Sequence, residues 1–231
     1  MSERYLITGA SRGIGRAIAR KIAAPGRELL LHGRDQEALV EVYSEVEAAG
    51  AKPAIFVCDL TRPEEIEKMV EKIGKAPLHV LINNAGVAVV KPLGDISLEE
   101  WQNSVDVNIT APFLLMQNLA PLMPEGATII NILSIAARTG FPEWSSYSMS
   151  KFAMEGFSQS VREELRPLGI RVVNVYPAAT DTEIWDDVEG DWPRENMLPA
   201  EEVAEAVAFA LERPSSVLVE NISVGRQGGN L

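Results

Sequence analysis

The stretch Thr8-Gly9-Ala10-Ser11-Arg12-Gly13-Ile14-Gly15 decides the fold class of this chain. It comes directly after a short apolar run, Tyr5–Thr8, and opens a segment of helical period, Gly13–Ala24. Glycines in such a turn let the backbone approach a pyrophosphate, whose negative charge the free N–H groups of the helix start stabilise. A tight turn with a purely structural role is the alternative. The position of the turn, at the beginning of a βαβ unit, favours dinucleotide binding.

Short apolar runs alternate with longer helical segments along the rest of the chain. The expected strands are Tyr5–Thr8, Glu28–His32, Ala54–Cys58, His79–Asn83, Ala127–Leu133, Arg171–Tyr176 and Val217–Val224. The expected helices are Gly13–Ala24, Gln36–Ala49, Pro63–Ile73, Leu98–Leu119, Ser146–Leu168 and Ala200–Leu211. This alternation predicts an α/β fold, a doubly wound Rossmann-type sheet of seven parallel strands with helices on both faces. At 231 residues a single domain is expected, spanning 1–231.

One long stretch, Pro177–Pro199, has no clear helical or strand period. It carries Trp185, Trp192 and several acidic residues. Loops of this length inside a compact domain are usually lids or disordered segments. We therefore expect a substrate lid at about 177–199.

The overall charge argues against several classes of partner. The 33 acidic residues outnumber the 21 basic ones and give a formal net charge of −12, the wrong sign for binding nucleic acid over a broad face. No stretch reaches about 18 uninterrupted apolar residues, so we expect a cytoplasmic protein with no membrane partner. The single cysteine, Cys58, cannot form an internal disulfide. Together with His32 and His79 it forms no cluster of metal-ligand spacing, so no catalytic metal is expected.

Further motifs follow the later strands. Asp59 follows the third, Asn83-Asn84-Ala85-Gly86 the fourth and Ser134 the fifth, and Tyr147-Ser-Met-Ser-Lys151 begins thirteen residues after Ser134. With the glycine-rich start, this set resembles the short-chain dehydrogenase/reductase family over essentially the entire chain. One departure is Pro177-Ala178, where the family has Pro-Gly, although Thr182 still matches the family's threonine. The stretch Thr182–Trp185 and the end Gly225–Leu231 are similar to small-carbonyl reductases of the sepiapterin and benzil reductase kind.

The resemblance implies a dinucleotide cofactor. The residues expected to bind it are Gly9, Ser11, Arg12, Gly13, Ile14, Gly15, Arg34, Asp59, Leu60, Asn83, Ala85, Gly86, Tyr147, Lys151, Pro177 and Thr182. Within this set, the resemblance implies that Asp59 binds the adenine and that Asn83, Ala85 and Gly86 line the cofactor groove. Turns at a helix start and at a strand end are the structural alternatives for Asp59 and for Asn83–Gly86.

The end of the second expected strand favours NADP(H) over NAD(H). Selective NAD binding needs a carboxylate there to accept hydrogen bonds from the ribose, but the strand ends His32-Gly33-Arg34, and Asp35 comes one position late. Gly33 leaves room for a 2′-phosphate, and Arg34 offers a planar, permanently charged group to bind it. Arg12 places a second cation nearby and resembles the pattern of NADP-preferring members of the family. Solvated surface charges are the alternative for both arginines.

Tyr147 and Lys151 are the centre of the expected catalytic set. Residues four apart share a helix face, so the ammonium of Lys151 is expected to lie near the phenol of Tyr147 and to lower its pKa. Ser134 is placed to hydrogen-bond the substrate oxygen. The resemblance further implies that Lys151 holds the nicotinamide ribose and that Asn108 holds a water in the proton relay. A turn serine and a packing asparagine are the structural alternatives for Ser134 and Asn108.

These features predict an NADP(H)-dependent oxidoreductase of small carbonyl or alcohol substrates, with Tyr147 as general acid and base. A 3-oxoacyl-[acyl-carrier-protein] reductase is an alternative, for which Arg138, Arg162, Arg166 and Arg171 would form a docking patch that the net charge opposes. A second alternative is a non-catalytic NADP-sensing regulator, which would not need the serine, tyrosine and lysine set. The resemblance also implies a homodimer or homotetramer.

Overall fold

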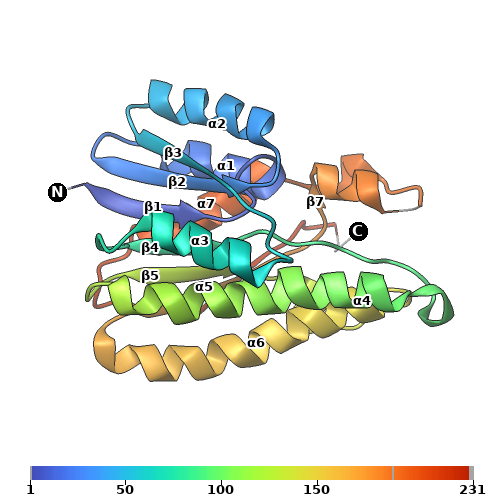
Figure 1. Ribbon diagram of the computed structural model, residues 1–231. Helices are drawn as coiled ribbons and strands as arrows, with labels where there is room; N and C mark the ends of the chain where they lie inside the picture. Colours follow the sequence, from blue (N-terminus) through green and yellow to red (C-terminus); the bar gives the residue numbers. More distant parts are fainter. Residues whose placement is uncertain (1, 189, 229–231) are drawn as a thin grey trace.

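A seven-stranded parallel sheet forms the centre of the molecule (Figure 1). The computed structural model describes residues 2–188 and 190–228. The sheet order is β3-β2-β1-β4-β5-β6-β9, with β1 Glu3–Ile7, β2 Arg27–Gly33, β3 Lys52–Val57, β4 Val80–Asn83, β5 Thr128–Ile132, β6 Arg171–Pro177 and β9 Asn221–Val224. The helices are α1 Gly13–Ile22, α2 Gln36–Ala48, α3 Pro63–Ile73, α4 Leu98–Val105, α5 Ala111–Leu119, α6 Ser145–Leu165 and α7 Ala200–Leu211. The predicted doubly wound Rossmann-type fold of a single domain is confirmed, and the strand order reverses between β1 and β4.

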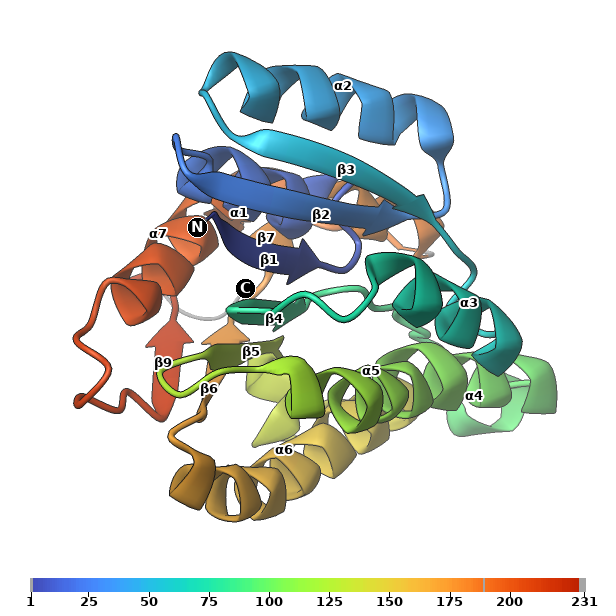
Figure 2. The same ribbon diagram turned by 60° about the vertical axis from the view of Figure 1, so that its left-hand side comes forward.

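Helices cover both faces of the sheet and create two apolar cores (Figures 1 and 2). Successive side chains of a strand point to opposite faces. Ile7 and Leu31 therefore pack with α1, α2 and α7, while their neighbours Leu6 and Leu30 pack with α3, α5 and α6. In parallel sheets covered on both faces, ligands bind outside the carboxyl ends of the strands, where the strand order reverses.

The expected helix Leu98–Leu119 is present, but it contains a π-helical turn that the sequence analysis did not predict. Residues Asp106–Thr110 form a π-helical segment in which the N–H of Ala111 donates to the carbonyl of Asp106, five residues back. Pro112 has no N–H and cannot make the α-helical bond to the carbonyl of Asn108, four residues before it. The widened turn is therefore centred on Asn108.

The last strand is shorter than expected. β9 begins at Asn221, whereas the sequence predicts a strand from Val217. Here the N–H of Val217 donates to the carbonyl of Pro214, which holds the chain in a turn. Val217 lies exposed beyond the sheet.

The segment 177–199 is folded against the body of the protein. β7 Thr180–Asp181 pairs with β8 Leu198–Pro199, and 3₁₀ turns lie between them, while residue 189 is outside the described residues. At its start, Ala178 donates to Val224 of β9. Glu143 is the one non-glycine residue with a positive φ in the described part of the chain, so the backbone at Ala178 does not require the family's glycine.

No helix among the described residues has the length and apolar character needed to cross a membrane.

Candidate active site

Two adjoining pockets lie at the carboxyl ends of the central strands. The first, called here the nucleotide pocket, contains most of the residues expected to bind the cofactor: Gly9, Ser11, Arg12, Gly13, Ile14, Arg34, Asp59, Leu60, Ala85, Gly86, Tyr147, Lys151 and Thr182. Gly15, Asn83 and Pro177 do not line it. A Cβ at Gly15 would lie 2.0 Å from the carbonyl oxygen of Gly9, so Gly15 permits close packing of α1 on the loop. Asn83 donates to Asn131 within the sheet, and Pro177 lines the second pocket.

The glycine-rich loop is shaped to receive an anion. Gly9 and Gly13 have φ values of +63° and +53°, in the left-handed region that favours glycine. The first N–H groups of α1 have no acceptor within the helix, and Arg12 at the cap position provides no side-chain cap. A helix start of this kind stabilises a phosphate through its N–H groups and its dipole. The observed geometry therefore fits a dinucleotide pyrophosphate.

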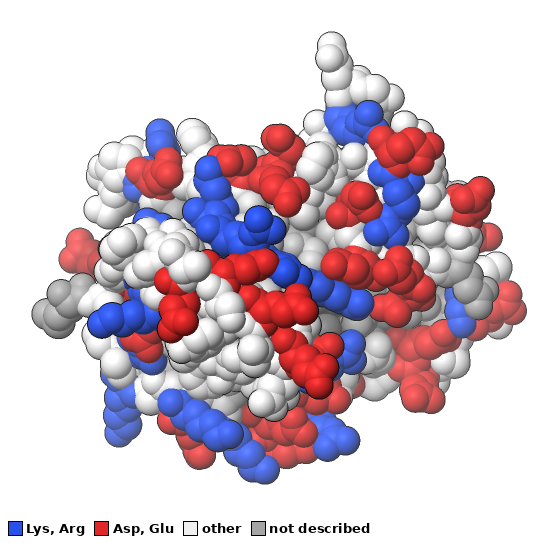
Figure 3. All heavy atoms as spheres, turned by 90° about the horizontal axis from the view of Figure 1, so that it is seen from above, with Lys and Arg blue, Asp and Glu red and all other residues white. Residues whose placement is uncertain are grey.

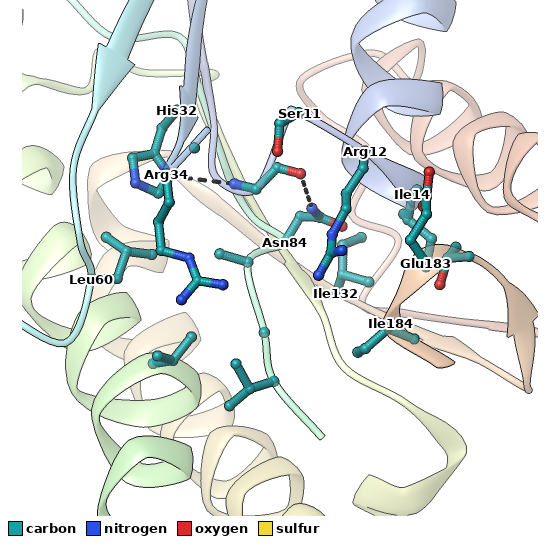
Figure 4. Close-up of a pocket in the computed structure, with 18 of the residues that line it drawn as sticks. Ser11, Arg12, Ile14, His32, Arg34, Leu60, Asn84, Ile132, Glu183 and Ile184 are labelled. Carbon is teal, nitrogen blue, oxygen red and sulfur yellow. Dashed lines mark hydrogen bonds between the residues drawn. The ribbon is translucent and has the colours of Figure 1, made fainter. Parts of the chain in front are cut away.

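His32 and Asn84 hold this loop in place, and sequence reasoning missed both. The N–H of Gly9 donates to Nδ1 of His32 (Figure 4). The other ring nitrogen is 3.1 Å from the carbonyl oxygen of Cys58, to which it donates. Burial lowers the pKa of His32 to about 4, so the ring is neutral at neutral pH. Nδ2 of Asn84 donates to the carbonyls of Thr8 and Gly9. Because these contacts join distant parts of the chain, no local pattern signalled them.

Two arginine side chains line the nucleotide pocket. The guanidinium groups of Arg12 and Arg34 both extend into the nucleotide pocket (Figure 4). Asp35 is committed elsewhere, because its side chain accepts from the N–H groups of Glu37 and Ala38 and caps α2. Arg12 forms an ion pair of 3.1 Å with Asp187 of the 177–199 segment. Arg34 is exposed and forms no ion pair within the described residues.

Tyr147, Ser134 and Lys151 come together as expected, but the pKa of the phenol differs from the prediction. Nζ of Lys151 lies 5.5 Å from the centroid of the Tyr147 ring and donates to the carbonyl of Ile132 at 3.0 Å. Burial raises the pKa of Tyr147 to about 12, which the hydroxyl of Ser134 partly opposes. Burial also lowers the pKa of Lys151 to about 8. Burial is the dominant cause, so the expected lowering of the phenol pKa by Lys151 is not seen in this arrangement. A protonated Tyr147 is a proton donor.

The side chain of Asn108 is engaged with protein groups. Its Oδ1 accepts from the N–H of Val87, and its Nδ2 donates to the carbonyl of Val87 and to Oγ of Ser150, all at 2.9 Å. Asn108 is buried and lines neither pocket. These bonds tie the chain after β4 to α6, which carries Tyr147 and Lys151. The side chain of Asn108 therefore helps to position Tyr147 and Lys151. The relay water expected at Asn108 remains a prediction.

The second pocket, called here the aromatic pocket, is largely apolar. Ser134 and Tyr147 lie in its lining, together with Phe141, Trp144 and Trp185. Tyr147 also lines the nucleotide pocket, so the phenol lies where the two pockets meet.

Comparison with known proteins identifies the family. A sequence profile of the short chain dehydrogenase family matches residues 3–192, which is most of the chain. The chain belongs to this family. L-2,3-butanediol dehydrogenase of Corynebacterium glutamicum is 34% identical over 93% of this chain and 87% of that protein. Sepiapterin reductase of Chlorobaculum tepidum is 31% identical over 100% of this chain and 99% of that protein.

A solved structure supports the same relationship. The crystal structure of a metagenomic short-chain oxidoreductase in complex with NADP has a TM-score of 0.83 and 30% identity, and the match covers 97% of this chain and 98% of that one. The resemblance inferred from the motifs is thus confirmed. The protein is an NAD(P)-dependent short-chain dehydrogenase/reductase that acts on carbonyl and alcohol groups.

Proposed function

We propose that this protein is an NADP(H)-dependent reductase of small, free carbonyl compounds, with Tyr147 as its general acid and base. The observation that carries the proposal is the position of Tyr147 at the junction of the nucleotide pocket and the aromatic pocket. A proton donor placed there reaches a substrate on one side and a cofactor on the other. Ser134 lines the aromatic pocket beside it.

The proposed cofactor is NADP(H). The start of α1 would hold the pyrophosphate, Arg34 and Arg12 the 2′-phosphate, and Asp59 with Leu60 the adenine end. When bound, NADPH supplies a hydride to the carbonyl carbon. The capping role of Asp35 supports this choice over NAD(H), because it leaves the end of β2 without a carboxylate for the ribose.

The residues of the chain supply the proton and fix its position. Tyr147 is protonated below its pKa of about 12 and donates its phenolic proton to the carbonyl oxygen of the substrate. The hydroxyl of Ser134 donates a hydrogen bond to the same oxygen and so orients the carbonyl. Lys151 adds a positive charge, which favours the phenolate that remains after the proton has left. In the direction of alcohol oxidation, the same phenolate accepts the proton.

The arrangement of basic residues favours a free substrate over one bound to acyl carrier protein. Arg162 is buried and paired with Glu220, and Arg166 is paired with both Glu163 and Glu220. Arg171 is at the beginning of β6, far along the strand from the carboxyl end that forms the site. Arg138 is stacked on the ring of Tyr176.

The visible surface charge points the same way. On the face seen in Figure 3, which is the α2 side of the molecule, basic and acidic side chains are interleaved, so this face offers an acidic carrier no extended basic surface. The second alternative is a non-catalytic sensor. It would not need Ser134, Tyr147 and Lys151 to lie together beside the aromatic pocket.

A homodimer or homotetramer is part of the proposal. Phe113 on α5 and Phe152 on α6 are exposed, and the ring of Phe113 contacts that of Phe157 in an edge-to-face arrangement. Exposed aromatic side chains on neighbouring helices are typical of a surface that a partner covers. Closed two-fold assemblies are the usual solution for soluble proteins.

The proposed function is tested with purified protein and a panel of ketones, aldehydes, diketones and acyl thioesters, each with NADPH and with NADH. We expect turnover of small carbonyl compounds with NADPH in preference to NADH. A carrier-bound thioester that turns over far faster than the matching small thioester, with an advantage that salt suppresses, would favour the carrier-dependent reductase. Tight NADPH binding without turnover of any substrate would favour the sensor.

A further inference from the structure

The aromatic pocket carries no formal charge in its lining. Among the described residues that form it, none is an aspartate, glutamate, lysine, arginine or histidine. Its hydroxyl groups come from Ser134, Tyr147, Thr180 and Thr182. A carboxylate or phosphate on a substrate would lose its hydration there without a cation to replace it. The pocket is therefore suited to an uncharged substrate.

One wall of the pocket is a cluster of aromatic rings centred on Trp144. The ring of Trp144 contacts Tyr147, Trp185 and Trp192 in edge-to-face arrangements, with centroid distances of 5.5, 5.9 and 5.9 Å. A fourth edge-to-face contact, to Phe141, has a centroid distance of 6.4 Å. Trp144 thus joins the proton donor to the aromatic side chains of the 177–199 segment.

The polar atoms of the two tryptophans in the 177–199 segment are already satisfied. Nε1 of Trp185 donates to the carbonyl of Thr180, and Nε1 of Trp192 donates to the carbonyl of Val188. These bonds fix both rings, so little conformational freedom is lost when a ligand contacts them. The cluster therefore forms a rigid wall of aromatic surface one contact away from the hydroxyl of Tyr147.

We propose that this pocket selects an uncharged ketone that carries a flat aromatic ring beside its carbonyl group, and that Trp144 is the residue that determines this specificity. The inference rests on the proposed function and adds the substrate class. Aromatic rings prefer edge-to-face or offset contacts with other rings, and such contacts add to the gain from burying apolar area. With the carbonyl oxygen at Ser134 and Tyr147, a ring on the carbonyl carbon reaches the Trp144 wall.

Three small probes separate ring recognition from charge exclusion. Ethyl benzoylformate is an uncharged 2-oxo ester with a phenyl ring, ethyl pyruvate replaces the ring with a methyl group, and benzoylformate keeps the ring but carries a carboxylate. With the full-length protein and NADPH, we expect kcat/KM for ethyl benzoylformate to exceed that for ethyl pyruvate by at least about tenfold. It should exceed that for benzoylformate by at least about a hundredfold, because burying an unpaired carboxylate is costly.

The variant Trp144→Leu tests the role of the wall. We expect the ratio of kcat/KM for ethyl benzoylformate over ethyl pyruvate to fall by about fivefold or more. Because both substrates use the same proton donor, a general effect on Tyr147 cancels in this ratio. The matched control is Phe209→Leu, which removes an exposed aromatic ring on α7, outside both pockets, and should leave the ratio unchanged. Should Trp144→Leu fail to fold, Trp185→Leu tests the same wall.

The possible results distinguish this inference from the proposed function. If all three probes are reduced equally well, the substrate class is wrong while the reductase activity stands. If the ring preference survives in Trp144→Leu, Trp144 does not determine the specificity. If none of the probes and no compound of the wider carbonyl panel is reduced with NADPH, the proposed function itself is contradicted, and this inference falls with it.

Discussion

Replacing Arg34 with alanine should remove most of the preference for NADPH over NADH. Arg34 extends into the nucleotide pocket and forms no ion pair within residues 2–188 and 190–228, so its guanidinium is available to a 2′-phosphate (Figure 4). A hydrogen bond to a charged group contributes about 1.5–3 kcal/mol. Because Arg34 is exposed, we expect the lower end of this range, a loss of roughly tenfold in NADPH affinity. NADH lacks the 2′-phosphate, so its affinity should change little.

Arg12 should contribute less than Arg34, because its guanidinium already has a partner. The side chains of Arg12 and Asp187 are 48% and 69% exposed, and an exposed ion pair of this kind stabilises by about 0.2–1 kcal/mol. Binding of a 2′-phosphate by Arg12 competes with this pair. Arg12→Ala should therefore weaken NADPH binding by a smaller factor than Arg34→Ala.

The purified protein is titrated with NADPH and with NADH at two salt concentrations. The dissociation constants are measured by calorimetry or from the fluorescence of the reduced nicotinamide. We expect the unmutated protein to prefer NADPH by at least about tenfold, equivalent to roughly 1.4 kcal/mol. Salt should weaken NADPH binding more than NADH binding, because the arginines are exposed. Equal affinity for both cofactors in the unmutated protein, or an unchanged ratio in Arg34→Ala, would show that Arg34 does not select NADPH.

Three other predictions test separate parts of the account. Asp187→Asn frees Arg12 and should tighten NADPH binding by roughly two- to fivefold in the same titration, and weaker binding would show that the pair does not compete with the cofactor. The pKa of His32 is lowered from 6.5 to about 4 in the folded protein, so the unfolded state takes up a proton first as pH falls. The free energy of unfolding should therefore decrease between about pH 6.5 and 4, by roughly 2 kcal/mol at pH 5. Urea unfolding at pH 7 and 5 measures this loss, which should shrink in His32→Gln; an equal loss in the variant would remove His32 as its cause. Sedimentation should give about two or four times the chain mass of 25.2 kDa, and a value near the single chain at micromolar concentration would contradict the proposed assembly.

The sequence pattern was sufficient for the fold because the fold depends on local periodicity. Apolar runs such as Leu29–Leu31 are buried on both faces, as expected for strands covered by two layers of helices. The glycine-rich turn is also readable locally, since Gly9 and Gly13 need the conformations that glycine permits. The π-helical turn around Asn108 had one local signal, Pro112, which removes an α-helical donor but does not reveal that the helix widens there.

The remaining features depend on contacts between distant residues. His32 reaches across 23 positions to hold Gly9, and Asn84 reaches across 75 positions to the same residue. The aromatic wall forms because Trp144 meets Trp185, which is far along the chain. The pKa of Tyr147 is raised by burial, which depends on all the elements that surround it. A helical spacing of four residues could place Lys151 near the phenol, but it could not show that desolvation prevails.

We propose that Tyr147 transfers the proton at the junction of the two pockets, and Tyr147→Phe removes the hydroxyl group that would do so. The measurement is steady-state turnover of a reducible ketone with NADPH, made on a variant whose folding and NADPH affinity have been shown to match those of the unmutated protein. Since the change removes only the hydroxyl group, we predict a fall in kcat by at least the contribution of a general acid, about 10²–10⁴-fold. A Tyr147→Phe protein that folds, binds NADPH and retains most of its turnover would contradict the account.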